Sequence, residues 1–124
     1  MFAPNSIVLA EKFALLEEFW SPRIVAELNG QWVKIAKGKG ELIWHSHDNE
    51  DELFQVFKGQ LTIHMRDHSV TLNPGDMYVV PRGVEHKPEA IGEVWIVLFE
   101  PKTTAHTGTT QSEQTVAIED QNWI

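Results

Sequence analysis

The chain has 124 residues, of which 42% are hydrophobic, none is cysteine, and the formal net charge is −8. Because compact domains most often hold about 100–150 residues, this length predicts one domain with its own core. The acidic charge argues against a nucleic-acid partner, which needs a basic face to replace the counterions around phosphates. The missing thiols exclude disulfides, thiolate metal ligands and a cysteine nucleophile.

The N-terminal residues predict a helix. Over residues 6–19, apolar side chains recur at helical spacing, Ser6 or Asn5 offers a cap, and Pro22 ends the pattern. We assign residues 1–22 to a helical segment that packs on the rest of the domain or on a partner. The same residues lack the basic start of a secretory signal, and no apolar run reaches the roughly 18–20 residues of a membrane span. We therefore expect a cytoplasmic protein with no membrane partner.

The chain then changes to the pattern of β-strands. Residues 23–28 and 31–36 flank Asn29-Gly30, and this dipeptide supplies the two positive φ values of a type I′ hairpin turn. Gly38 to Gly40 is expected to form a loop.

Residues 52–58 and 60–66 flank Lys58-Gly59, which predicts a second tight hairpin. In that hairpin one face would line the interior, and His64 would point outward. The interior face would comprise Glu52, Phe54, Val56, Leu61, Ile63 and Met65.

The remaining segments extend the β pattern. Short strands are predicted at 69–72 and 77–80, a turn at 73–76, a bend at 81–83 and a buried final strand at 94–100. We therefore expect an all-β fold, an antiparallel β-barrel or jelly roll over residues 23–100, with the short N-terminal helix outside it. Residues 101–124 form a C-terminal arm. Its part at 101–115 is expected to hug the surface or to be partly disordered, and the final Trp123-Ile124 should dock.

Histidines two residues apart mark the candidate site. On a strand, residues i and i+2 share a face, so His45 and His47 would point into one interior. Five residues after His47 comes Glu52, which a short acidic turn would bring beside them. Two imidazoles and one carboxylate make a first-row metal site that lacks one ligand.

Two segments resemble the conserved motifs of cupins. Residues 40–59 resemble the first cupin motif, with the two histidines, Glu52 and Gly59 at the motif's spacing. Residues 75–86 resemble the second motif, which implies that His86 is the fourth ligand. Two positions depart from the pattern: Gly40 lies one residue nearer the histidines, and Ala90 replaces a frequent Asn. The chain therefore resembles small single-domain bacterial cupins of the cupin_2 group, which include mannose-6-phosphate isomerase-like proteins.

The resemblance implies one divalent transition-metal ion, either Fe, Mn, Ni, Co, Cu or Zn, because imidazole and carboxylate suit all six. Four protein ligands on an octahedral ion leave two positions for a small-molecule ligand. The predicted pocket comprises Phe54, Val56, Ile63, Met65 and Tyr78. The motif fits a metal-dependent enzyme, with dioxygenase-like or Lewis-acid chemistry on a small organic substrate, and the apolar lining favours an aromatic one. It also fits a non-catalytic metal or ligand binder, and a sugar-phosphate isomerase-like protein.

Two further expectations complete the analysis. The other histidines, His64, His68 and His106, fall outside the motifs and are expected on the surface. Small cupins commonly pair through their terminal segments, so the resemblance also implies a homodimer.

Overall fold

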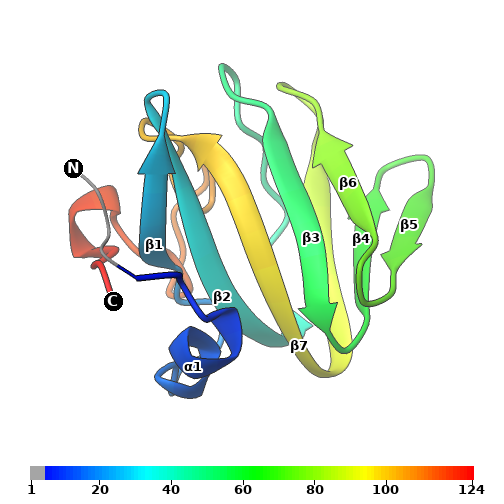
Figure 1. Cartoon of the computed structure of the whole chain (residues 1–124). Coiled ribbons are helices and arrows are strands. Elements are labelled where there is room, and N and C mark those ends of the chain that lie inside the picture. The colour runs from blue at the N-terminus through cyan, green and yellow to red at the C-terminus, as the bar shows by residue number, and fades with distance from the viewer. Residues whose placement is uncertain (1–4) are drawn as a thin grey trace.

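The computed structural model describes residues 5–124, and strands dominate it (Figure 1). The strands are β1 (Arg23–Leu28), β2 (Gln31–Glu41), β3 (Glu52–Lys58), β4 (Leu61–Met65), β5 (Ser69–Leu72), β6 (Met77–Val80) and β7 (His86–Pro101). The helices over this range are α1 (Leu9–Ala14) and the short 3-10 helix η1 (Ile118–Asp120). The predicted all-β fold with one short N-terminal helix is confirmed.

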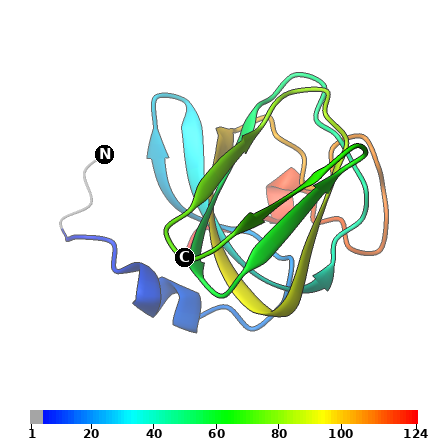
Figure 2. The ribbon, with the colours of Figure 1, turned by 90° about the vertical axis from the view of Figure 1, so that its right-hand side faces the viewer.

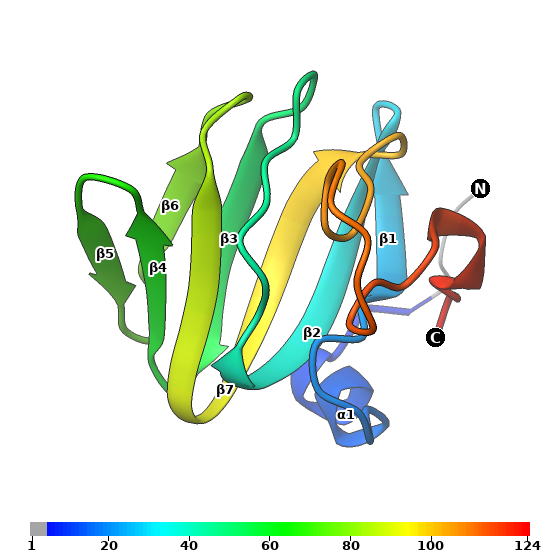
Figure 3. The same ribbon diagram turned by 180° about the vertical axis from the view of Figure 1, so that it is seen from behind.

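The strands pair antiparallel around the long strand β7. One side of the molecule has the order β1-β2-β7-β3-β6, and β4 joins β5 to β7 on the other side. The first residues of β7 pair with β4, its last residues pair with β3, and β2 follows it along most of its length. Because one bent strand belongs to both sides, the sheet curls around a common interior (Figures 2 and 3). The final strand predicted at 94–100 therefore begins eight residues earlier than expected.

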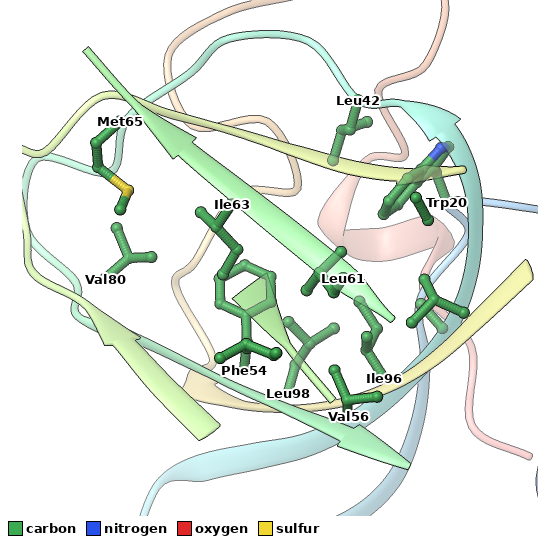
Figure 4. Close-up of a cluster of buried hydrophobic side chains, with 14 residues drawn as sticks. Trp20, Leu42, Phe54, Val56, Leu61, Ile63, Met65, Val80, Ile96 and Leu98 are labelled. Atoms are coloured by element: carbon green, nitrogen blue, oxygen red, sulfur yellow. The ribbon is translucent and has the colours of Figure 1, made fainter. Parts of the chain in front are cut away.

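Alternating side chains fill this interior. Phe54 and Val56 of β3, Leu61 and Ile63 of β4, and Ile96 of β7 are all buried and point toward one another (Figure 4). The inner face predicted for residues 52–65 is therefore confirmed, since Glu52 and Met65 are buried too. This burial removes apolar surface from water, the main favourable term in folding.

The two predicted hairpins have different outcomes. Asn29 and Gly30 have φ values of 48° and 77° and join β1 to β2, which confirms the first. The second is wrong, because β3 pairs with β6 and β7, and β4 pairs with β5 and β7. Gly59 instead carries the chain from one side of the barrel to the other. A Cβ there would lie 2.4 Å from the carbonyl oxygen of Glu93, so the crossing requires glycine.

The loop predicted at residues 38–40 is also wrong. Strand β2 continues through it to Glu41, with a register shift between Gly38 and Gly40. The shift lies opposite Ile91–Glu93, where β7 bends. At Gly38 the sheet is covered by the Trp20 ring, which a Cβ would approach to 2.6 Å.

The helix is shorter than predicted. It spans Leu9–Ala14, follows Val8, and has no side-chain cap from Ser6 or Asn5. The chain leaves the helical path because Trp20 binds β2: its backbone N–H donates to Lys37 and its indole N–H to the Lys39 carbonyl. Phe13 is fully buried on the outer face of the sheet and stacks on Trp95 at 5.0 Å. Neither helix within residues 5–124 is long and apolar enough to cross a membrane.

The C-terminal arm packs against the barrel. It crosses β2 and β1 on the side nearer the viewer in Figure 3, where Lys34 of β2 donates to Gln121, and its residues Thr104, Thr107 and Gln121 are buried. The chain end docks as expected: the backbone N–H of Ile124 donates to the carbonyl of Ile24, and Trp123 forms a bridge with the same residue. Of the two alternatives expected for residues 101–115, the structure therefore shows the arm that lies against the barrel.

Candidate metal centre

Three histidines and one glutamate converge inside the barrel, and all four are buried. Glu52 is the first residue of β3 and His86 the first of β7. His45 and His47 lie in the connection between β2 and β3, so their predicted strand is wrong. Their ligand atoms still lie close together. His45 is held in place by an isolated bridge with His86.

Backbone hydrogen bonds join the two motif segments. His45 and His86 each donate a backbone N–H to the other's carbonyl, at 3.0 and 2.9 Å. The backbone N–H of Gly83 donates to the carbonyl of His47 at 2.7 Å. Outside the barrel, Arg82 pairs with Asp51. Residues about 40 positions apart in sequence are thus fixed beside one another.

The ligand atoms lie at distances that suit one ion. One ligand atom from each of the four residues can be chosen so that all lie within 4.8 Å of one another. Glu52 Oε1 is 3.5 Å from His47 Nε2 and 3.6 Å from His86 Nε2. Two atoms bound to one ion at about 2.1 Å can be at most about 4.2 Å apart. Small side-chain rotations would therefore bring the four donors onto one ion.

Hydrogen bonds orient two of the rings. Nδ1 of His45 is 2.7 Å from the carbonyl of Ile43, and Nδ1 of His86 is 2.9 Å from that of Val84. A carbonyl only accepts, so each Nδ1 carries the proton and each Nε2 keeps its lone pair. Nε2 of His86 and both ring nitrogens of His47 have no hydrogen-bond partner within residues 5–124. Buried polar atoms normally have one, so the two Nε2 atoms, which both lie near Glu52, are arranged for a cation.

Burial and neighbouring charges set the protonation of the site. Burial lowers the pKa of His45 to about 4, and the neighbouring His86 adds to this. Burial alone would raise the pKa of Glu52, but Glu100, His47 and His86 outweigh it and hold that pKa well below its usual range. His45 is therefore neutral and Glu52 ionised near pH 7, which are the forms that bind a metal.

A second buried carboxylate stands beside the site. In the register of β3 and β7, Leu53 pairs with Phe99, so the next inward pair is Glu52 and Glu100. Lys34 Nζ lies 2.7 Å from Glu100 Oε1 and also donates to the amide oxygen of Gln121. Burial and the charge of Glu52 raise the pKa of Glu100 well above its usual range, against the effect of Lys34.

The sequence analysis missed Lys34 and Glu100. A signal existed in the alternation of β2, where Val33 and Ile35 face outward and Lys34 faces the interior. The equivalent alternation in β7 places Glu100 inward with Ile96 and Leu98. Both charged residues lie within runs that are otherwise apolar, so the runs were interpreted as core strands without a buried charge.

A small cavity adjoins the ligands. Its volume is about 30 Å³, which is room for a water molecule or two. Its lining includes His45 and Glu52 of the ligand set and Glu100 and His106 beside them, and the rest is mainly apolar: Trp20, Pro22, Ala36, Leu42, Phe54, Pro88, Ile96 and Leu98.

The predicted pocket and surface residues fall in different places. Of the five pocket residues, Phe54 lines the cavity, Val56, Ile63 and Met65 lie in the core, and Tyr78 packs half-buried against it. His64 lies on the outer side as expected and contacts Ser69 and Glu89, and His68 is exposed. His106 is not on the open surface as expected: it is partly buried, because the arm folds back and brings it into the cavity wall. Nothing in its Thr- and Gly-rich surroundings signals this.

Comparisons with known proteins agree with this fold. Residues 31–100 match the family model described as "Cupin domain". A cupin-2 domain containing protein from Shewanella frigidimarina is 47% identical, with a TM-score of 0.75 over 77% of this chain and 93% of that one. Protein NMB1881 from Neisseria meningitidis is 30% identical, with a TM-score of 0.72 over 78% of this chain and 99% of that one. YdbB of Bacillus subtilis is 31% identical over 78% of this chain and 79% of its own length.

Proposed function

Because this chain belongs to the cupin domain family, we propose that it binds one divalent transition-metal ion through His45, His47, Glu52 and His86. The observation that carries the proposal is the set of buried ring nitrogens that lack hydrogen-bond partners within residues 5–124 and face one carboxylate. The donor set of three imidazoles and one carboxylate suits Fe, Mn, Ni, Co, Cu or Zn.

We further propose that the protein is a metal-dependent enzyme on a small organic molecule. The bound metal would supply Lewis acidity or activate dioxygen. Trp20, Phe54 and Leu42 favour an apolar or aromatic substrate, because they give the cavity a largely apolar wall. Glu100 would add one hydrogen-bonding group for orientation.

A second candidate is a non-catalytic binder of a metal or small ligand. The small size of the cavity favours it, since an organic substrate enters only after the wall has moved. The mannose-6-phosphate isomerase-like alternative and the cytoplasmic location stay predictions. For a sugar phosphate, the cavity lining offers no arginine or lysine.

The metal proposal is tested with His86→Ala and the control His64→Ala. Losing one of four ligands should weaken metal binding by more than the roughly 10–100-fold typical of outer-sphere changes. His64 lies outside the ligand set, so its variant should keep full metal content. The measurements are metal content and thermal melts with and without EDTA, followed by oxygen uptake with Fe(II). Full metal content in His86→Ala would refute the site, and metal binding without turnover would favour the binder.

We also propose that two copies pair, through the outer face near β6 rather than through the terminal segments, which pack on the chain's own strands. This strand pairs only with β3 among residues 5–124 and exposes Met77 and Val79, while Phe57 is exposed on β3. An edge strand with exposed apolar residues is a ready surface for association. Light scattering should give twice the 14.1 kDa monomer mass, and Val79→Glu should shift it toward the monomer. A wild-type mass of one chain at micromolar concentration would refute the pairing.

A further inference from the structure

The C-terminal arm brings an additional histidine to the metal cavity. We propose that His106 hydrogen-bonds the exogenous ligand that occupies the open positions of the metal. This inference rests on the proposed function, because it requires a metal held by the four ligands described above. It assigns to the arm a part in ligand selection.

His106 lies in the cavity wall without belonging to the ligand set. It lines the same space as His45 and Glu52. The group of atoms that could hold one ion comprises only the four motif residues among residues 5–124. His106 borders the space next to two of the proposed ligands, His45 and Glu52. It is therefore placed to contact a metal-bound ligand.

The ring is neutral and its donor atom is defined. Nδ1 of His106 accepts a hydrogen bond from the backbone N–H of Val116 at 2.9 Å. In a neutral imidazole the proton then resides on Nε2, which becomes the donor. Burial lowers the pKa of His106 to about 4, an effect that Glu52 and the Gln114 carbonyl offset only in part. The ring is thus neutral near pH 7 and carries its one N–H on Nε2.

The arm is built to hold this ring in place. Two residues after His106, Gly108 packs on Ser46, the residue between the ligands His45 and His47. A Cβ on Gly108 would lie 1.8 Å from the Ser46 carbonyl oxygen, and its φ is +57°. The Gln114 side chain accepts from the Ile43 N–H and donates to the Glu41 carbonyl. These contacts tie the arm to the segment that carries the ligands.

The choice of a histidine at position 106 indicates more than a space-filling role. An apolar side chain would seal the cavity without the cost of burying a polar ring. The volume of about 30 Å³ limits the ligand to a few atoms while the arm is docked. Water, dioxygen or a small anion meets this limit.

Azide binding to the Co(II)-loaded protein tests the inference. The visible absorption of cobalt reports azide at the metal, and the variants are His106→Leu, His106→Gln and the exposed control His68→Leu. A hydrogen bond to a charged group corresponds to about a 10-fold change in affinity or more. We expect His106→Leu to weaken azide binding by about that factor, His106→Gln to restore most of it, and His68→Leu to match wild type. All four proteins should contain equal cobalt.

Each contrary result has a separate meaning. Unchanged azide affinity in His106→Leu with full cobalt overturns the inference alone. So does a loss of cobalt in that variant, which would make His106 a ligand or a fold support. Equal weakening of azide binding in the Leu and Gln variants also overturns the inference, because it indicates a change of cavity shape rather than the loss of a hydrogen-bond donor. A wild-type cobalt protein that does not bind azide overturns the inference too. If wild type takes up no cobalt, the proposed metal site itself is wrong, and the role of His106 falls with it.

Discussion

Replacing Lys34 by methionine removes the positive charge that lies 2.7 Å from Glu100 in the interior. The Lys34 side chain is fully buried and Glu100 is nearly so, so the carboxylate is left without its partner. Removing one member of a buried ion pair typically costs about 3–5 kcal/mol. Because the pKa of Glu100 is already raised, this carboxyl can take up a proton. We therefore expect the free energy of unfolding to fall by about 3 kcal/mol, the lower end of that range.

The expected change in melting temperature follows from the chain length. An unfolding entropy of about 2.1 cal/mol/K per residue gives about 0.26 kcal/mol/K for this chain, so a loss of about 3 kcal/mol lowers the melting temperature by about 12 °C. The assay is urea unfolding and thermal melting of the metal-free protein at pH 7. Lys39→Met is the matched control, because Lys39 is exposed on the same strand. Lys39→Met should change the free energy of unfolding by no more than about 0.5 kcal/mol.

A double variant separates the charge pair from simple packing. Lys34→Met with Glu100→Leu replaces both charged groups by apolar side chains, and such replacements are often neutral or stabilising. The double variant should therefore be more stable than Lys34→Met alone. A cost below about 1 kcal/mol for Lys34→Met would refute the reasoning. The reasoning would also be refuted if the double variant lost as much free energy of unfolding as Lys34→Met and Glu100→Leu lose separately, added together.

Two further predictions concern the histidines and the arm. The metal-free protein should lose stability as pH falls from about 6.5 to about 4, because the folded state keeps His45 and His106 neutral with pKa values of about 4, while the unfolded chain takes up protons near pH 6.5. Urea unfolding at pH 7 and pH 5 checks this, and equal stability at both would contradict it. Gly108→Ala should destabilise by about 1 kcal/mol or more, because the new Cβ collides with Ser46 and the φ is positive. Gly92→Ala, which meets no atom within 4 Å, should be near neutral in the same melts.

Much of the fold was predictable because its signals are local. The Asn29-Gly30 turn and the alternation in β3 and β4 depend on neighbouring residues, and both agree with the structure. The partners of a strand are not local. Lys58-Gly59 has the composition of a hairpin turn, yet it joins two strands that each pair elsewhere, with β7 between them.

The site shows the same division. The spacing of His45, His47 and Glu52 and the motif around His86 predicted four side chains that the structure brings together. His106 was missed because its position depends on how the arm folds back, on contacts such as Gly108 with Ser46. Glu100 was missed because its importance comes from the register of β3 against β7.

The place of β7 in the barrel sets the order in which the site is assembled. During synthesis His45, His47 and Glu52 emerge before His86, so the early chain carries an incomplete donor set. The set closes only when the first residues of β7 have paired with β4 and the backbone bridge to His45 has formed. The arm follows β7 in the chain and packs on the barrel, so we expect it to dock after that. We therefore expect metal to enter late in folding, and the rate at which the mature protein exchanges it to follow local opening of the arm.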